Sequence, residues 1–178
     1  MHAVEYEAKF LDIEPLSMAS RIEQAGGVFR GERLMRRYVY DTVPPVQGRW
    51  LRLRDSGDGV TLCVKTITSD AIDGTQETET TVGSFEDTHA LLGLMGLTPR
   101  SYQENRRSSW VLDEVRLEID SWPGIPPYLE IEGDDEQAVR ATAERLSIPS
   151  EELTSENTTK VFRRYGIDLE PITDLRFS

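Results

Sequence analysis

Residues 3–11 read AVEYEAKFL, and apolar and charged side chains alternate along this stretch with a period of two. The charged positions are Glu5, Glu7 and Lys9, and the positions between them are apolar. A period of two is typical of a β-strand whose two faces meet different surroundings. The stretch therefore predicts a strand with one apolar face and one charged face.

The same alternation returns along most of the chain. It predicts strands at residues 28–33, 34–41, 50–55, 60–66, 76–82, 102–112, 115–121 and 128–132. Helical patterns with capping residues predict helices at residues 15–25, 84–95, 136–146 and 158–165. Because no repeat or linker divides the chain, we expect one domain over residues 1–178, with a core at 3–166 and a tail at 167–178.

The charged positions of the predicted strands carry almost only carboxylates, arginine and lysine. A solvated sheet face gives the same alternation, but such faces are usually rich in Thr, Ser, Gln and Lys. Like charges that meet on one face repel each other unless something lies between them. A closed antiparallel tunnel of eight strands, with helices packed on its outside, satisfies both faces because its lumen can hold ligand ions. We therefore expect an α+β fold built on such a tunnel.

The composition limits what the chain can bind. A net charge of −12 argues against a surface for nucleic acid or anionic membrane, since both require an exposed basic face. Cys63 is the only cysteine, and His2 and His89 are the only histidines, which excludes a zinc site built from Cys and His. With no recognisable export signal or membrane span, we expect a cytoplasmic monomer or homodimer without nucleic-acid or membrane partners.

The charged positions offer two kinds of ligand. Glutamate pairs such as Glu5/Glu7 and Glu130/Glu132 provide the hard oxygen atoms that Mg²⁺ and Mn²⁺ prefer. Arginine and lysine suit phosphate oxygens, and the basic residues at strand positions include Arg52, Arg54, Lys65 and Arg107. Together they predict a site for a polyphosphate, with Mg²⁺ or Mn²⁺ as cofactor.

A series of motifs carries these residues in a fixed order. The motifs are Glu5-x-Glu7-x-Lys9, Tyr40-Asp41-Thr42, Trp50-Leu51-Arg52-Leu53-Arg54, Lys65, Arg107-Ser108-Ser109-Trp110, Ile119-Asp120 and Leu129-Glu130-Ile131-Glu132. In this order, over about residues 4–165, they resemble the CYTH superfamily of triphosphate tunnel metalloenzymes. That superfamily includes class IV adenylyl cyclases, thiamine triphosphatases and inorganic triphosphatases.

The resemblance implies a role for each matched residue. Metal binding falls to Glu5, Glu7, Asp120, Glu130 and Glu132. Phosphate binding falls to Lys9, Arg52, Arg54, Lys65, Arg107 and Lys160, of which Lys9, Arg54, Lys65 and Arg107 are the expected catalytic residues. Glu77, Glu79 and Glu118 are further candidates for acidic tunnel positions.

Two positions depart from the pattern of the superfamily. A basic residue is common two positions before Arg107, where this chain has Asn105, unless the register shifts so that Arg106 faces the lumen. Arg37 stands where an acidic residue is common. The first departure predicts one positive charge fewer in the phosphate site.

Metal-dependent hydrolysis of an inorganic or organic triphosphate is the function that the sequence favours, and the expected partner is a small molecule containing a triphosphate. In the alternative, the same site converts ATP to cyclic AMP and pyrophosphate, although no motif specifies an adenine pocket. A non-catalytic sensor of polyphosphate or nucleotide is a third hypothesis. The full set of candidate metal carboxylates argues against the sensor, because phosphate alone would be bound more easily without them.

Overall fold

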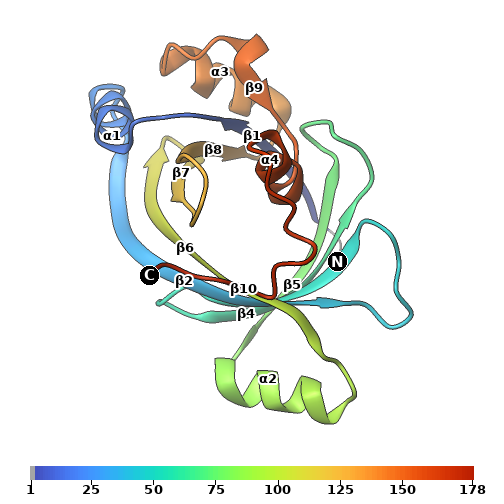
Figure 1. Ribbon diagram of the computed structural model, residues 1–178. Helices are drawn as coiled ribbons and strands as arrows, with labels where there is room; N and C mark the ends of the chain where they lie inside the picture. Colours follow the sequence, from blue (N-terminus) through green and yellow to red (C-terminus); the bar gives the residue numbers. More distant parts are fainter. Residues whose placement is uncertain (1–2) are drawn as a thin grey trace.

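The computed structural model describes residues 3–178, in which eight strands close into a barrel and four helices lie outside it (Figure 1). The barrel strands are β1 (Ala3–Phe10), β2 (Val28–Asp41), β3 (Arg49–Asp55), β4 (Val60–Ile67), β5 (Thr75–Val82), β6 (Pro99–Leu112), β7 (Val115–Ser121) and β8 (Tyr128–Gly133). The helices are α1 (Pro15–Gln24), α2 (Phe85–Leu94), α3 (Glu136–Arg145) and α4 (Thr158–Arg164). Two short strands, β9 (Leu153–Thr154) and β10 (Asp174–Leu175), pair with β1 and β6.

The barrel closes because β6 pairs with β2 on one side and with β7 on the other. The strand order around the ring is β6-β2-β3-β4-β5-β1-β8-β7, and the pairs of this ring are antiparallel. Closure leaves no free edge on these eight strands. The α+β fold predicted from the sequence, a closed eight-stranded tunnel with external helices, is thus confirmed.

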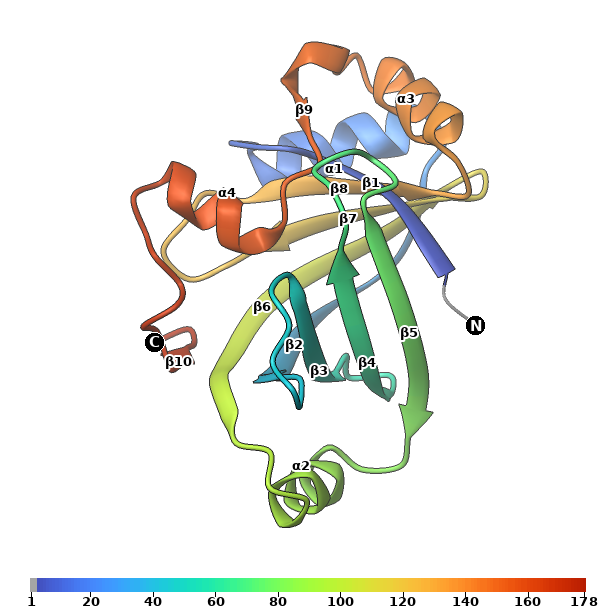
Figure 2. The same cartoon turned by 90° about the vertical axis from the view of Figure 1, so that its right-hand side faces the viewer.

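The apolar faces of the strands point outward, and α1, α2 and α3 cover them in two cores. A third core, next to α4, includes Trp122 and Tyr128, which also line the cavity. α1 and α3 contribute to a core with β1, β7 and β8 in which Leu117 and Ile131 are fully buried. α2 packs over Tyr40 and Leu53, and α4 packs with the C-terminal segment around Trp122. Figure 2 shows α1 and α3 at one end of the view and α2 at the opposite end. With the apolar residues outside, the charged faces turn into the lumen.

The strand predicted at 28–33 and the strand predicted at 34–41 are one continuous strand, β2. Gly31, with a φ of 136°, lies at a register shift between β2 and β6. Such a β-bulge bends a strand without reversing it, so the chain runs on instead of turning. None of the helices within residues 3–178 is long and apolar enough to cross a membrane.

Replacing Leu117 by Ala removes a fully buried side chain from the core under α1 and α3. We expect the free energy of unfolding to fall by about 2 to 5 kcal/mol, measured by urea denaturation. Leu94 on α2 is 86% exposed, so Leu94→Ala is the matched control. This substitution should change the free energy of unfolding by less than about 0.5 kcal/mol. Equal losses in the two variants would contradict a core outside the barrel.

Candidate functional site

The lumen of the barrel holds a cavity of about 390 Å³ whose wall is mainly charged. Nine basic and nine acidic residues of the described chain line it, whereas the whole chain has a net charge of −12. The excess of negative charge therefore lies outside the lumen.

Arginines of β3 form one wall of the cavity. Arg52 and Arg54 point inward, while Leu53 between them packs outward under α2. The Arg52 guanidinium donates from Nη2 to Glu77 at 3.1 Å, and the Arg54 guanidinium donates from Nη2 to Glu79 at 3.5 Å. The Nε atom of each arginine is buried and has no hydrogen-bond partner. Each guanidinium thus keeps an unpaired donor in the cavity wall.

Arg107 on β6, by contrast, is fully engaged with β7 and β8. Its Nε and Nη2 atoms donate to the two oxygens of Asp120 at 2.8 and 2.6 Å, and Nη2 also donates to Glu130 at 3.2 Å. Asn105 donates to the same Asp120 carboxylate at 2.8 Å. Although burial opposes its charge, Asp120 and the neighbouring glutamates raise the pKa of Arg107 well above its ordinary value. Arg107 and Asp120 therefore behave as one charge-balanced unit.

Lys9 on β1 lies between two predicted metal ligands. Its ammonium is 2.9 Å from Glu7 and 3.3 Å from Glu130, and the residue is 1% exposed. Burial works against the charge of Glu130, but Lys9 and Arg107 hold the pKa of this carboxyl far below its usual range. The Glu130 carboxylate is thus already balanced by two cations.

Lys65 on β4 joins the carboxylates of β1 and β5. Its ammonium lies 2.7 Å from Glu5 and 3.0 Å from Glu77. Burial, reinforced by a hydrogen bond with Glu77, raises the pKa of Glu5 to about 8. Near neutral pH the Glu5 and Glu77 pair therefore keeps one proton, which takes the place of a missing positive charge.

Glu118 and Glu132 are less well balanced. Glu7 and Glu132 lie directly opposite each other on β1 and β8, and Glu132 pairs with Arg116, whose side chain is 61% exposed. Burial is the main cause that raises the pKa of Glu118 and of Glu132. Opposed carboxylates without enough counter-charge suit a hard divalent cation such as Mg²⁺ or Mn²⁺. Each predicted metal ligand has a basic partner, and Glu132 is the one whose partner is largely exposed.

One potential donor atom, the sulfur of Cys63, was not predicted from the sequence. Potential ligand atoms of Cys63, Glu77 and Glu79 lie within 4.8 Å of one another on β4 and β5. Burial raises the pKa of the Cys63 thiol to about 11, which keeps it protonated. A protonated thiol is a poor metal ligand, so the hard carboxylates remain the better candidates.

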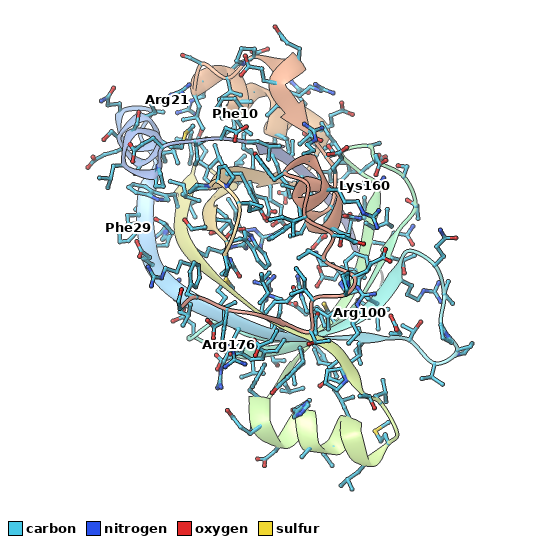
Figure 3. The ribbon with its side chains drawn as sticks, in the orientation of Figure 1. Phe10, Arg21, Phe29, Arg100, Lys160 and Arg176 are labelled. Atoms are coloured by element: carbon cyan, nitrogen blue, oxygen red, sulfur yellow. The ribbon has the colours of Figure 1, made fainter. Side chains whose placement is uncertain are left out.

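The predicted residues converge on this cavity, with Lys160 as the exception. The cavity is lined by Glu5, Glu7, Lys9, Arg52, Arg54, Lys65, Glu77, Glu79, Arg107, Glu118, Asp120, Glu130 and Glu132. Lys160, labelled in Figure 3, is not a lining residue; its ammonium pairs with Asp70, and both side chains are partly exposed. The neighbouring Asn157, Thr158 and Thr159 line the cavity instead.

The residues preceding Arg107 show how the lumen differs from the expectation. Asn105 is fully buried and faces inward, while Arg106 is exposed and lies 4.8 Å from the ring of Phe177. The Arg37 guanidinium on β2 donates to the Asn105 side chain and lines the cavity. A positive charge therefore lies beside Asn105, although the sequence predicted one charge fewer. Only the pairing of β2 with β6 reveals this neighbour.

Comparisons with known proteins agree with the fold. The sequence profile of the CYTH domain matches residues 3–165. The PH1012 protein of Pyrococcus horikoshii is 19% identical, with a TM-score of 0.74 over 86% of this chain and 96% of its own. A putative adenylate cyclase of Vibrio parahaemolyticus is 17% identical, with a TM-score of 0.75 over 90% of this chain and 98% of its own.

A further similar structure is a putative adenylyl cyclase of Hippeastrum with a dominant triphosphatase activity. It is 15% identical, with a TM-score of 0.59 over 93% of this chain and 96% of its own. No curated protein matches the sequence. At these identities the structural likeness shows the fold alone.

Replacing Asp120 by Ala removes the shared partner of Arg107 and Asn105 and leaves a largely buried arginine without its main counter-charge. We expect the free energy of unfolding to fall by about 3 to 5 kcal/mol. Asp113 pairs with Arg145 at the surface, so Asp113→Ala is the control and should cost about 1 kcal/mol or less. Urea denaturation measures the free energy of unfolding of both variants. If Asp120→Ala lost no more stability than Asp113→Ala, the pair of Arg107 and Asp120 would not be what orders the lumen.

Proposed function

Because the chain belongs to the CYTH family, we propose that it is a metal-dependent hydrolase of a triphosphate bound in the lumen of the barrel. The unpaired Nε donors of Arg52 and Arg54 carry this proposal. A buried donor without an acceptor costs about 1 to 3 kcal/mol. An anion with several oxygen atoms would remove that cost, so these arginines are prepared for a phosphate group.

The spread of the basic groups favours a chain of phosphates over a single one. They come from β1, β3, β4 and β6 and lie on different sides of the lumen: Lys9, Arg52, Arg54, Lys65 and Arg107. One phosphate group reaches only some of these cations. Three linked phosphates reach more of them.

In the proposed reaction a water oxygen forms a bond to a terminal phosphorus while the bond from that phosphorus to the bridging oxygen breaks. The electron pair of the broken bond stays on the departing group, whose growing negative charge Arg52 and Arg54 stabilise. Glu118 lines the cavity and accepts a hydrogen bond from Ser109 at 2.6 Å. Its pKa is raised, mainly by burial, which suits it to take the proton of the attacking water.

A divalent ion, when bound, would neutralise phosphate oxygens and help to orient the chain of phosphates. Glu5, Glu7 and Glu132 are the residues that we assign to hold it. Lys9 and Arg107 keep Glu130 and Asp120 neutralised beside them. These basic residues therefore preserve the shape of the lumen in addition to contacting the substrate.

The substrate class includes organic triphosphates. The aromatic side chain of Trp50 is half-buried and lines the cavity. A tryptophan face can receive the organic part of a substrate. Cyclisation of ATP would use the same phosphate site, but it would also need a binding site for the base, and the cavity wall is mainly charged.

The activity is tested directly by incubating the protein with inorganic triphosphate, ATP or thiamine triphosphate in Mg²⁺ or Mn²⁺ and separating the products by chromatography. We expect release of phosphate from at least one substrate, and we expect EDTA to stop it. Cyclic AMP without phosphate release would contradict hydrolysis in favour of a cyclase. No turnover of any substrate would contradict it in favour of a binding protein.

Replacing Arg54 by Gln removes one of the two arginines of β3 with an unpaired donor. We expect kcat/KM to fall by about 100-fold, because the substitution removes a charge that the transition state needs, while the circular dichroism spectrum stays unchanged. Arg49 lies on the same strand but is exposed and donates to Thr66. Arg49→Gln is the matched control, and its kcat/KM should stay within about twofold of the wild-type value. Similar values of kcat/KM for the two variants would refute the lumen as the active site.

A further inference from the structure

Arg37 differs from the other basic residues of the predicted site in its partners. Among the described residues, each of the others has a carboxylate at ion-pair distance, namely Lys9, Arg52, Arg54, Lys65 and Arg107. Arg37 is 8% exposed and has no such partner within residues 3–178. Its Nε atom is buried and makes no hydrogen bond. The lumen therefore contains one buried arginine that has no carboxylate at ion-pair distance among the described residues.

The surroundings of Arg37 make this imbalance costly. Arg37 lies directly opposite Arg54 in the register of β2 and β3. Burial and the charges of Arg52, Arg54 and Arg107 lower the pKa of Arg37 to about 9. Like charges directly opposite each other on neighbouring strands repel, so an anion between Arg37 and Arg54 would relieve the repulsion.

The guanidinium of Arg37 is nevertheless held in place. Its Nη2 atom donates to the Asn105 side chain, and its centre lies 4.6 Å from the ring centroid of Trp122. Trp122 is in turn fixed by a hydrogen bond of 2.9 Å to Tyr128 and by an edge contact with Phe162. One edge and one face of the guanidinium are thus occupied by neutral groups, while the Nε position stays unpaired.

A purely structural role does not require the charge. A neutral glutamine or methionine at this position would avoid the repulsion from three other arginines, and Asn105 would keep its bond to Asp120. The side chain that is present instead brings a permanent cation into the cavity wall. Such an arrangement is useful when a ligand supplies the missing negative charge.

We propose that Arg37 is a further binding residue for the anionic substrate, donating to phosphate oxygens next to Arg54. This inference rests on the proposed function, and it places part of the phosphate chain against the inward faces of β2 and β3. Arg37 would then contribute the positive charge that is absent at Asn105. The Asn105 side chain acts as a positioning residue that orients Arg37 and links it to the Asp120 and Arg107 unit.

The test is titration calorimetry with inorganic triphosphate in EDTA, where no metal supports turnover. We expect Arg37→Gln to bind about 10- to 100-fold more weakly than the wild type, because it loses charge-assisted hydrogen bonds. Arg36 is the matched control, since it faces the other side of β2 and pairs with Asp55 and Glu86. Arg36→Gln should bind triphosphate as the wild type does.

The melting temperature of the ligand-free variants separates binding from a structural role. We expect Arg37→Gln and Arg37→Met to melt at or above the wild-type temperature, since each removes an unbalanced buried charge. Unchanged triphosphate affinity in Arg37→Gln would overturn the role of Arg37 while leaving the proposed hydrolase intact. Weaker binding with a lower melting temperature in both variants would also overturn it, as a structural effect. A wild-type protein that neither binds nor hydrolyses triphosphate would refute the inference and the proposed function together.

Discussion

A buried charge is stable only beside an opposite charge or a bound ion, and the lumen of this barrel is organised by that constraint. On the side of β1, β7 and β8, cations lie between carboxylates, as Lys9 does between Glu7 and Glu130. On the side of β2 and β3, arginines keep unpaired donors in the cavity wall. The first side has close pairs of opposite charge, whereas the second has donors that an anion would satisfy.

The same constraint explains where the hydrophobic cores lie. A strand has two faces, and once the charged face is enclosed in the lumen, the apolar face must be covered from outside. α1 and α3 provide this cover at one end and α2 provides it at the other, as Figures 1 and 2 show. The fold therefore separates stability, which comes mainly from the outer cores, from binding, which comes from the lumen.

Much of this arrangement could be predicted from the sequence because successive residues of a strand point to opposite faces of the sheet. Alternation alone put residues such as Glu5 and Arg52 on the enclosed face, and the ordered motifs identified the family. Facts that depend on contacts between distant strands could not be predicted in this way. The role of Arg37 beside Asn105 follows from the register of β2 with β6, and the pairing of Lys160 with Asp70 follows from how α4 sits against the β4–β5 loop.

The most direct measurement is a crystal structure of the protein with inorganic triphosphate and Mn²⁺, in which anomalous scattering locates the manganese. Triphosphate is predicted to lie in the lumen with its oxygens at hydrogen-bond distance from the Nε atoms of Arg52 and Arg54. Manganese is predicted beside Glu5, Glu7 and Glu132, across the lumen from the arginines. A triphosphate bound only at the outer surface, or manganese found only at exposed carboxylates, would contradict the account.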